Sequence, residues 1–381
     1  MKATATRPQP AQNVRFPALR RAIGLWRLPL LGAAILGLLA AIWAGWLRIG
    51  WQLPVLQPSL AGAHAPLMVS GFFGTLIGIE RAVALQKRWA YLAPLLSGLG
   101  ALLLMSGANS ALAGLLLVGG SYCLAGMLVW YLARHPALYL LVMAGGGAAL
   151  AVGNTLWLAG WPVYRLVLWW AAFLILTIAG ERLELGRMMR RPRAAGPLFS
   201  LAAAVFSAGL LAGLFAPGPG VRLAALGLVG LAAWLLRYDI ARKTVRQQGL
   251  PRFAAICLLS GYVWLGAAGV LGLVFGLPPA GFHYDAVLHS IFLGFVFAMI
   301  FAHAPIIFPA ILGLPVRYHP VSYLPLLLLH ASLLARVAGD LLVIPSLRLA
   351  GGISNGITIL VFLVLTAGSI LLGLRQKAAS G

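Results

Sequence analysis

Long apolar segments recur along the whole of this 381-residue chain. Each is about 20 residues long, which is enough for an α-helix to cross roughly 30 Å of hydrocarbon. Hydrophobic residues make up 62% of the sequence and charged residues only 9%, which excludes a soluble globular protein. Backbone polar groups find no water inside a bilayer, so an all-α, polytopic membrane protein is predicted. The expected helices, about twelve, lie near 29–48, 64–86, 91–107, 110–133, 136–159, 163–183, 196–215, 221–237, 253–276, 284–311, 320–343 and 352–374.

Basic residues between these segments predict the orientation. With the N-terminus in the cytoplasm, the inner side receives Lys87, Arg88, Arg134, the clusters in 182–193 and 237–252, Arg317, Arg375 and Lys377. The outer side then carries single arginines, namely Arg48, Arg165, Arg222 and Arg348. Asp239, in a basic loop, is predicted to lie on the surface. The net charge of +22 is explained by this placement in the lipid bilayer, so no nucleic-acid partner is expected.

The same placement predicts the domain organisation and the location. Residues 1–28 form a basic cytoplasmic segment, 29–374 a single transmembrane helical domain, and 375–381 a cytoplasmic tail. The chain is expected to be a multi-pass protein of the inner (cell) membrane with both termini in the cytoplasm.

Two histidines, His64 and His289, lie in apolar segments near the predicted outer face. An intramembrane imidazole is costly unless it binds a ligand or a hydrogen-bond partner. Both segments run from the outside inward, so the two rings lie at similar depth. Two histidines that face each other across a gap between helices can hold a haem iron axially. The other interpretation of each is a hydrogen bond to a neighbouring helix.

Two further histidines suggest a second metal site. His303 follows His289 by fourteen residues, which returns to nearly the same helix face about 21 Å further inward. His330 falls near the middle of the eleventh segment, where an unpaired imidazole is expensive. It either joins His303 around a metal or bonds a neighbouring helix.

Several residues could support a cofactor at these histidines. Asp285 lies four residues before His289, where its carboxylate can accept the non-ligating ring hydrogen, or it is an interfacial acid. Arg48 and Arg165 are candidates to pair with the two carboxylates of a haem, or they anchor helix ends. Met68 carries a thioether that would suit copper.

Charged residues inside the segments define an alternative. Glu80 and Arg81 are adjacent, so they are expected to point to different sides of a helix and to have separate partners. Arg336 and Asp340 are four apart and are able to pair. These four could serve a secondary transporter of a small solute, and Glu80 or Glu181 could mark a proton route. Structural ion pairing is the other interpretation.

Three stretches resemble known families. Residues 287–300, VLHSIFLGFVFAMI, resemble the C-terminal histidine helix of the NnrS family, and 333–338, LLARVA, resemble its following helix. Residues 64–68, HAPLM, with Gly71 and Phe72, are similar to its early histidine helix and to the corresponding helix of haem-copper oxidase main subunits. The resemblance implies about twelve helices, haem and copper binding, and a role in nitric-oxide tolerance or denitrification.

The resemblance also implies ligands. In the oxidases, histidines of the second and tenth helices hold the low-spin haem, and His64 and His289 match them. The copper ligands there come from the sixth and seventh helices, but 163–183 and 196–215 contain no histidine. Oxygen reduction of the oxidase type is therefore not expected. The NnrS pattern has a second histidine and a Glu near the early histidine, whereas 63–68 offers one histidine, so haem is favoured over copper.

The sequence thus predicts a bundle like subunit I of the haem-copper oxidases that binds haem b through His64 and His289. Arg48, Arg165, Arg336 and Asp285 complete the expected cofactor site. Electron transfer with a redox partner protein, or the binding of a small gas such as nitric oxide, is the expected role. The alternatives are the transporter and a scaffold subunit of a respiratory complex.

Overall fold

The structure, a computed structural model, describes residues 24–314 and 318–379. Within these residues the secondary structure is entirely helical, and twelve segments are long and apolar enough to cross a membrane. The predicted all-α, multi-pass fold is confirmed. The segments are Leu28–Ile49 (α1), Ala61–Leu85 (η2, α2, η3 and α3), Arg88–Ser106 (η4 and α4), Ser110–Arg134 (α5), Leu138–Leu158 (α6), Val163–Leu185 (α7), Ala195–Phe215 (α8), Pro217–Tyr238 (α9), Leu250–Phe275 (α11), Phe282–Pro309 (α12, η5 and α13), Pro320–Leu341 (η6 and α14) and Pro345–Leu374 (α15).

Most bounds differ from the predicted ones by a few residues. The largest shifts are at both ends of α15 and at the start of α9, and these two helices begin at Pro345 and Pro217. Proline suits a helix start because its fixed φ is helical and its missing N–H needs no partner there. The helix α15 also continues beyond the predicted span to Ala379. Residues 1–23 of the predicted N-terminal segment, Arg317 and the last two residues of the tail lie outside the described residues.

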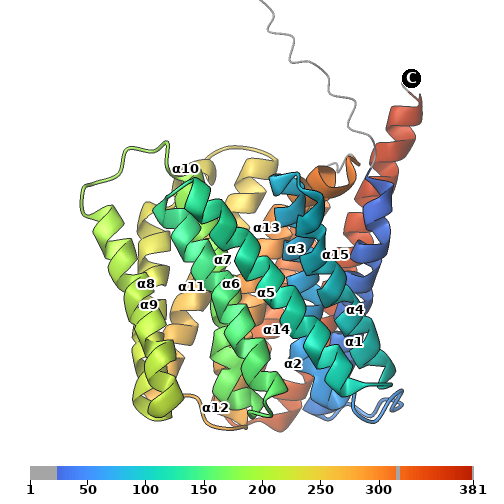
Figure 1. Ribbon diagram of the computed structural model, residues 1–381, viewed down its shortest axis with the longest axis vertical. Coiled ribbons are helices and arrows are strands. Elements are labelled where there is room, and N and C mark those ends of the chain that lie inside the picture. Colours follow the sequence, from blue (N-terminus) through green and yellow to red (C-terminus); the bar gives the residue numbers. More distant parts are fainter. Residues whose placement is uncertain (1–23, 315–317, 380–381) are drawn as a thin grey trace, which may run out of the picture.

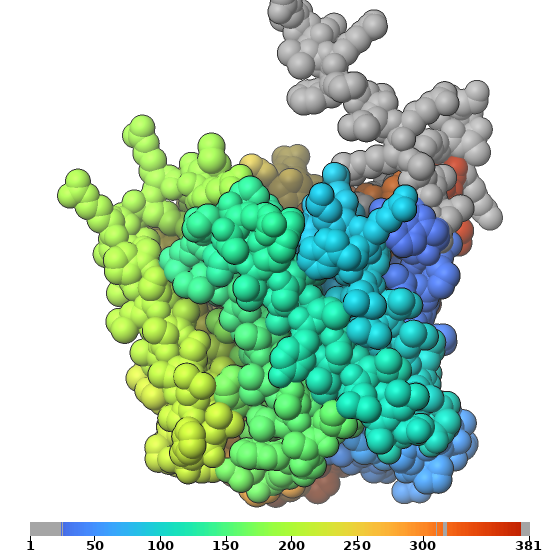
Figure 2. Space-filling view, viewed as in Figure 1, coloured from blue at the N-terminus to red at the C-terminus, as the bar shows by residue number. Residues whose placement is uncertain are grey.

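The helices run side by side in one bundle (Figure 1). Short connections make consecutive helices pack as neighbours, as in the pairs α6–α7, α8–α9 and α14–α15. The pair α8–α9 forms one flank, and α1, α4 and α15 form the opposite flank. The first and last helices are in contact, so the bundle brings the two ends of the described chain together. In Figure 2 the side chains of α5 to α9 cover much of the visible face.

Two of the spans contain a π-helical segment. Leu67–Phe73 (η3) follows the three-residue helix His64–Pro66 (α2), and Ser290–Phe297 (η5) follows Phe282–His289 (α12). In a π-helix each N–H bonds five residues back, and such segments are rare and frequent at functional sites. Each one here begins within three residues of a histidine singled out from the sequence.

Aromatic side chains join the two π-helical segments. The ring of Phe297 stacks on Phe72 with centroids 6.4 Å apart and meets Phe73 edge-on at 5.7 Å. All three rings are buried. The second and tenth spans are therefore neighbours in the middle of the bundle, as two histidines at one site require.

The buried side-chain amide of Asn154 holds the π-helical segment η3 in place. Asn154 of α6 accepts hydrogen bonds through Oδ1 from Ser70 Oγ of η3 at 2.6 Å and from Trp170 Nε1 of α7 at 2.9 Å. Its Nδ2 donates to Leu117 O of α5 at 3.1 Å. Since water cannot replace a lost partner here, Asn154 ties four helical elements together.

A buried ion pair closes the opposite end of α7. Arg182 donates through Nε and Nη2 to Asp239 at 3.0 and 2.9 Å, and Asp239 Oδ1 also accepts from Ala241 N at 2.7 Å. Asp239 is only 1% exposed, so its predicted surface position was wrong. The reason is that α7 brings Arg182 beneath the basic loop, where a lone guanidinium would be costly.

We expect Asn154→Leu to lower the free energy of unfolding by at least about 2 kcal/mol, because it leaves buried groups of Ser70, Trp170 and Leu117 unpaired. The matched control is Ser70→Ala, which should cost less because Asn154 Oδ1 still accepts from Trp170. Unfolding in mixed detergent micelles would measure both. Equal losses for the two variants would contradict this role of Asn154.

A cavity between the two histidine helices

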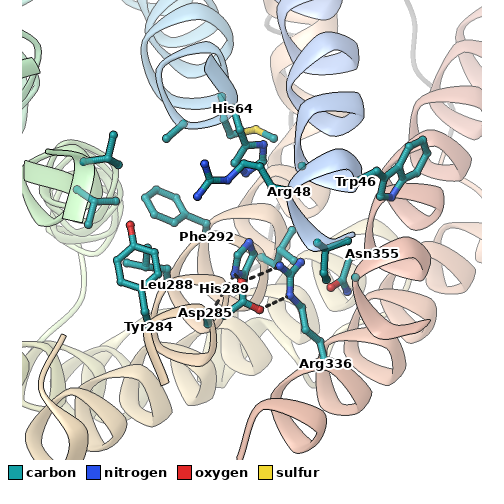
Figure 3. A pocket seen from close by; sticks show the side chains of 18 of the residues that line it. Trp46, Arg48, His64, Tyr284, Asp285, Leu288, His289, Phe292, Arg336 and Asn355 are labelled. Carbon is teal, nitrogen blue, oxygen red and sulfur yellow. Dashed lines mark hydrogen bonds and ion pairs between the residues drawn. The ribbon is translucent and has the colours of Figure 1, made fainter. Parts of the chain in front are cut away.

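A cavity of about 460 Å³ lies between α1, the start of the second span, α12, α14 and α15 (Figure 3). This volume lies within the range of small-molecule and cofactor sites, roughly 300 to 1,000 Å³. The cavity brings together five of the six residues predicted from the sequence to bind a cofactor. They are Arg48, His64, Asp285, His289 and Arg336.

His64 stands at the start of α2 with its ring against α1. Its Nδ1 lies 2.7 Å from Ala41 O. A carbonyl oxygen only accepts, so Nδ1 carries the hydrogen and Nε2 keeps its lone pair. Nε2 has no hydrogen-bond partner among residues 24–314 and 318–379. Gly45 makes room for the ring, because a Cβ at that position would lie 2.9 Å from His64 Cε1.

His289 ends α12 and is held in the same tautomer. Its Nδ1 lies 2.9 Å from Asp285 O, one turn earlier, and 3.2 Å from Asp285 Oδ1. The carbonyl again accepts the Nδ1 hydrogen, which leaves the Nε2 lone pair without a partner in the described chain. Both histidines therefore line the cavity with an unused ring nitrogen, the arrangement found in histidines that ligate metals.

Arginines from two other helices hold Asp285. Arg336 of α14 donates to its carboxylate through Nε and Nη2 at 2.7 and 2.9 Å. Arg348 of α15 lies 3.5 Å from Asp285 and 3.0 Å from Asp340, whose carboxylate is fully buried. Arg336 does not form the pair with Asp340 that the spacing allows, because its forked guanidinium binds both carboxylate oxygens of Asp285 on α12.

Arg348 is the residue of this cluster that sequence reasoning missed. It had been assigned only to the outer side of the membrane. The signal that could have found it is the very short connection between α14, which ends at Leu341, and α15, which begins at Pro345. A turn of this length places Arg348 beside the last turn of α14, where Asp340 lies.

The other predicted arginines differ in their position. Arg48 of α1 lines the cavity and is exposed, and it has no ion-pair or hydrogen-bond partner among the described residues. Arg165 is not at this cavity. Its Nη2 lies 3.4 Å from Leu214 O, its guanidinium lies over Trp161, and it lines a separate, smaller cavity between α7, α8 and α9.

The histidines predicted for a second site are engaged elsewhere. His330 Nδ1 accepts from Trp264 Nε1 at 3.1 Å, and its Nε2 lies 3.0 Å from Ser260 Oγ. Both ring nitrogens thus bond α11, which is the interhelical alternative. His303 Nδ1 donates to Met299 O at 2.7 Å. Within the described residues no group of three or more His, Cys, Asp or Glu side chains could hold a metal ion.

A second group of charges lies at the other end of the second span. Arg81 of α3 bonds Glu80 at 3.1 Å and also Glu181 of α7, and it reaches Met143 Sδ of α6 at 3.8 Å. The expectation of separate partners for Glu80 and Arg81 was wrong, because the long guanidinium bends to meet its neighbour and Glu181 together.

The fold and the cavity define a multi-pass helical membrane protein with a polar site between two histidine-bearing helices. The chain belongs to the family DUF8744, described as a domain of unknown function, which matches residues 27–371. No curated protein and no solved structure matches it. The resemblance to the NnrS family, and the oxidase-like arrangement of the helices, therefore stay predictions.

We expect Arg336→Leu to cost about 3 to 5 kcal/mol of folding free energy, because Asp285 loses its bidentate partner and keeps only the longer contact to Arg348 as an arginine pair. The double variant Asp285→Leu with Arg336→Leu should cost less than the sum of the two single variants. Detergent unfolding of all three proteins would measure the coupling. Additive losses would show that the pair is not energetically linked.

Proposed function

We propose that this protein binds haem b between His64 and His289 and serves in electron transfer or in the response to nitric oxide. One observation carries the proposal. Both histidines line one cavity, both donate Nδ1–H to a backbone carbonyl, and both keep Nε2 unused. Imidazole nitrogen is a common haem ligand, and a fixed tautomer prepares each ring for ligation.

The lining of the cavity suits the rest of a haem. Haem presents two carboxylates, and the unpaired guanidinium of Arg48 is available to bind one of them in a fork. Arg336 and Arg348 also line the cavity. Both contact Asp285, and together they add positive charge to the cavity. Haem supplies an iron that changes between two oxidation states. The apolar side chains of Leu288 and Phe292 would exclude water from it.

Copper has weaker support. Met68 lines the same cavity as His64, and a thioether beside imidazole suits copper. Beyond His64 and His289 the described residues place no histidine or cysteine in the cavity lining, and among them no group of three or more His, Cys, Asp or Glu side chains could hold a metal ion. We therefore propose haem as the resident cofactor.

We also propose the inner membrane as the location, with both termini in the cytoplasm. An even number of spans returns the chain to the side where it began. The basic loops at Lys87, Arg134 and 187–193 then lie on the cytoplasmic side, as the charge bias of membrane loops requires. The cavity opens near the opposite end, beside the last turn of α1, which carries Arg48.

The test is an oxidised-minus-reduced visible spectrum of detergent-purified, haem-supplied protein, with metal analysis on the same sample. We expect one haem per chain with the sharp reduced α and β bands of two-histidine ligation. The double variant His64→Ala with His289→Ala should lose the haem. The control His303→Ala should keep it, because that ring makes the same kind of carbonyl bond but does not line the cavity.

A colourless and metal-free preparation would refute the haem proposal. Ion-gradient-driven uptake into cofactor-free vesicles would then be the next measurement. That experiment tests the transporter alternative, with variants at Glu80, Arg81, Arg336 and Asp340.

We expect Gly45→Ala to weaken the two-histidine bands of the reduced haem although every proposed ligand is retained. The new Cβ would lie 2.9 Å from His64 Cε1 and 3.1 Å from its Nδ1, so the ring must leave its bond to Ala41 O. The matched control is Gly32→Ala in the same helix, where a Cβ meets nothing within 4 Å. Equal reduced α and β bands per haem in the two variants would contradict the assigned position of His64.

A further inference from the structure

The two histidines of the cavity are not held alike. His64 Nδ1 meets one neutral acceptor, the carbonyl of Ala41 at 2.7 Å. His289 Nδ1 meets both the carbonyl of Asp285 at 2.9 Å and the carboxylate of the same residue at 3.2 Å. A carboxylate that accepts the ring hydrogen makes the opposite nitrogen more basic, and therefore a stronger ligand.

The carboxylate behind His289 is itself fixed. Arg336 holds both of its oxygens in a bidentate pair, and Arg348 adds a longer contact from α15. Asp285 is only 7% exposed, so these bonds are not shared freely with water. The ring of His289 is thus attached to three helices, namely its own α12, α14 and α15.

His64 has a lighter attachment. Its helix α2 is three residues long and lies between the 3-10 turn Ala61–Ala63 (η2) and the π-helical segment η3. Residues 51–60 before it form no regular helix. A single carbonyl bond and the contact with Gly45 hold the ring. When the His64 ring rotates away it loses one carbonyl bond, whereas the His289 ring loses a carbonyl bond and a carboxylate contact. The rotation of His64 therefore costs less interaction energy.

The surroundings of His64 combine apolar side chains with the guanidinium of Arg48, which lies near the ring in Figure 3. Ile42, Ala65, Met68 and Val69 line the cavity on this side. A neutral ligand of two atoms can occupy the space beside these apolar side chains without leaving a charge or a polar group unpaired.

We infer that His289 would hold the haem iron permanently and that His64 would be the exchangeable ligand, so that a small neutral diatomic gas would take the place of His64. This inference rests on the proposed haem site. It narrows that proposal from electron transfer alone to the reversible binding of a gas of the nitric oxide class, and it names the side of the cavity on which the gas binds.

The experiment uses the full chain with haem, reduced and titrated with carbon monoxide as the probe. We expect His64→Ala to keep its haem and to bind carbon monoxide about tenfold or more tightly than the unmodified protein. In the unmodified protein the gas can bind only in the minor state in which the His64 ring has moved away, whereas in the variant the position is always open. His289→Ala should lose most of its haem. Added imidazole should restore the two-histidine spectrum to His64→Ala, which shows that the variant is folded.

Two carboxylate variants test whether Asp285 is the reason why His289 would hold the haem more firmly than His64. Asp285→Asn keeps the backbone carbonyl but removes the carboxylate beside His289, and we expect haem retention to weaken about 10- to 100-fold. Asp340→Asn is the matched control, since Asp340 is buried in the same cluster and pairs with Arg348, and the described structure contains no contact between it and His289. It should retain haem as the unmodified protein does.

The outcomes separate the two proposals. If the unmodified protein shows two-histidine ligation but the His64→Ala and His289→Ala variants lose haem equally, the inference is overturned and the haem site stands. The same holds if His64→Ala loses the haem and His289→Ala keeps it, or if both carboxylate variants behave alike. If the unmodified protein binds no haem at all, the proposed function itself has failed.

Discussion

Inside a bilayer every polar group must find its partner within the protein, and this constraint explains where the charges of the structure lie. Arg182 pairs with Asp239, Arg81 with Glu80 and Glu181, and Asp285 with Arg336 and Arg348. Apart from the contact of Arg81 with its neighbour Glu80, these pairs join helices that are distant in the sequence, so they help to fix which helices are neighbours. Three groups without a described partner are informative because of where they lie. The Nε2 atoms of the two cavity histidines and the guanidinium of Arg48 have no described partner, and they meet at one cavity.

The backbone is adapted to that cavity. A π-helical segment follows each histidine, and Phe72, Phe73 and Phe297 pack the two segments against each other. Asn154 anchors the first segment to three further helices. A wider turn with a different hydrogen-bond register costs stability, so its presence beside both histidines is better explained by the geometry that the site needs than by the fold alone.

The helices could be predicted because apolar length is a strong signal, and the loop charges gave the depth of each residue, which paired His64 with His289. Depth, however, says nothing of position around the bundle. Arg165 lies at the predicted outer end with Arg48, yet it lines a different cavity between α7, α8 and α9. Partners across helices, such as Asp239 for Arg182 or Arg348 for Asp340, depend on how each helix is rotated, and hydropathy does not encode that rotation. The sequence therefore indicated the two cavity histidines better than the ion pairs that surround them.

The distribution of polar groups along the second and tenth spans bears on the choice between cofactor and transport. His64 and Arg81 are separated by the buried rings of Phe72 and Phe73, and 17 residues of helix correspond to roughly 25 Å. On the tenth span Phe297 lies in the same way between His289 and His303. A transporter must expose one set of groups to both sides in turn, but the two charged clusters lie at opposite ends with this aromatic layer between them. A bound cofactor needs only one end, and the polar cavity with unused ring nitrogens is at that end.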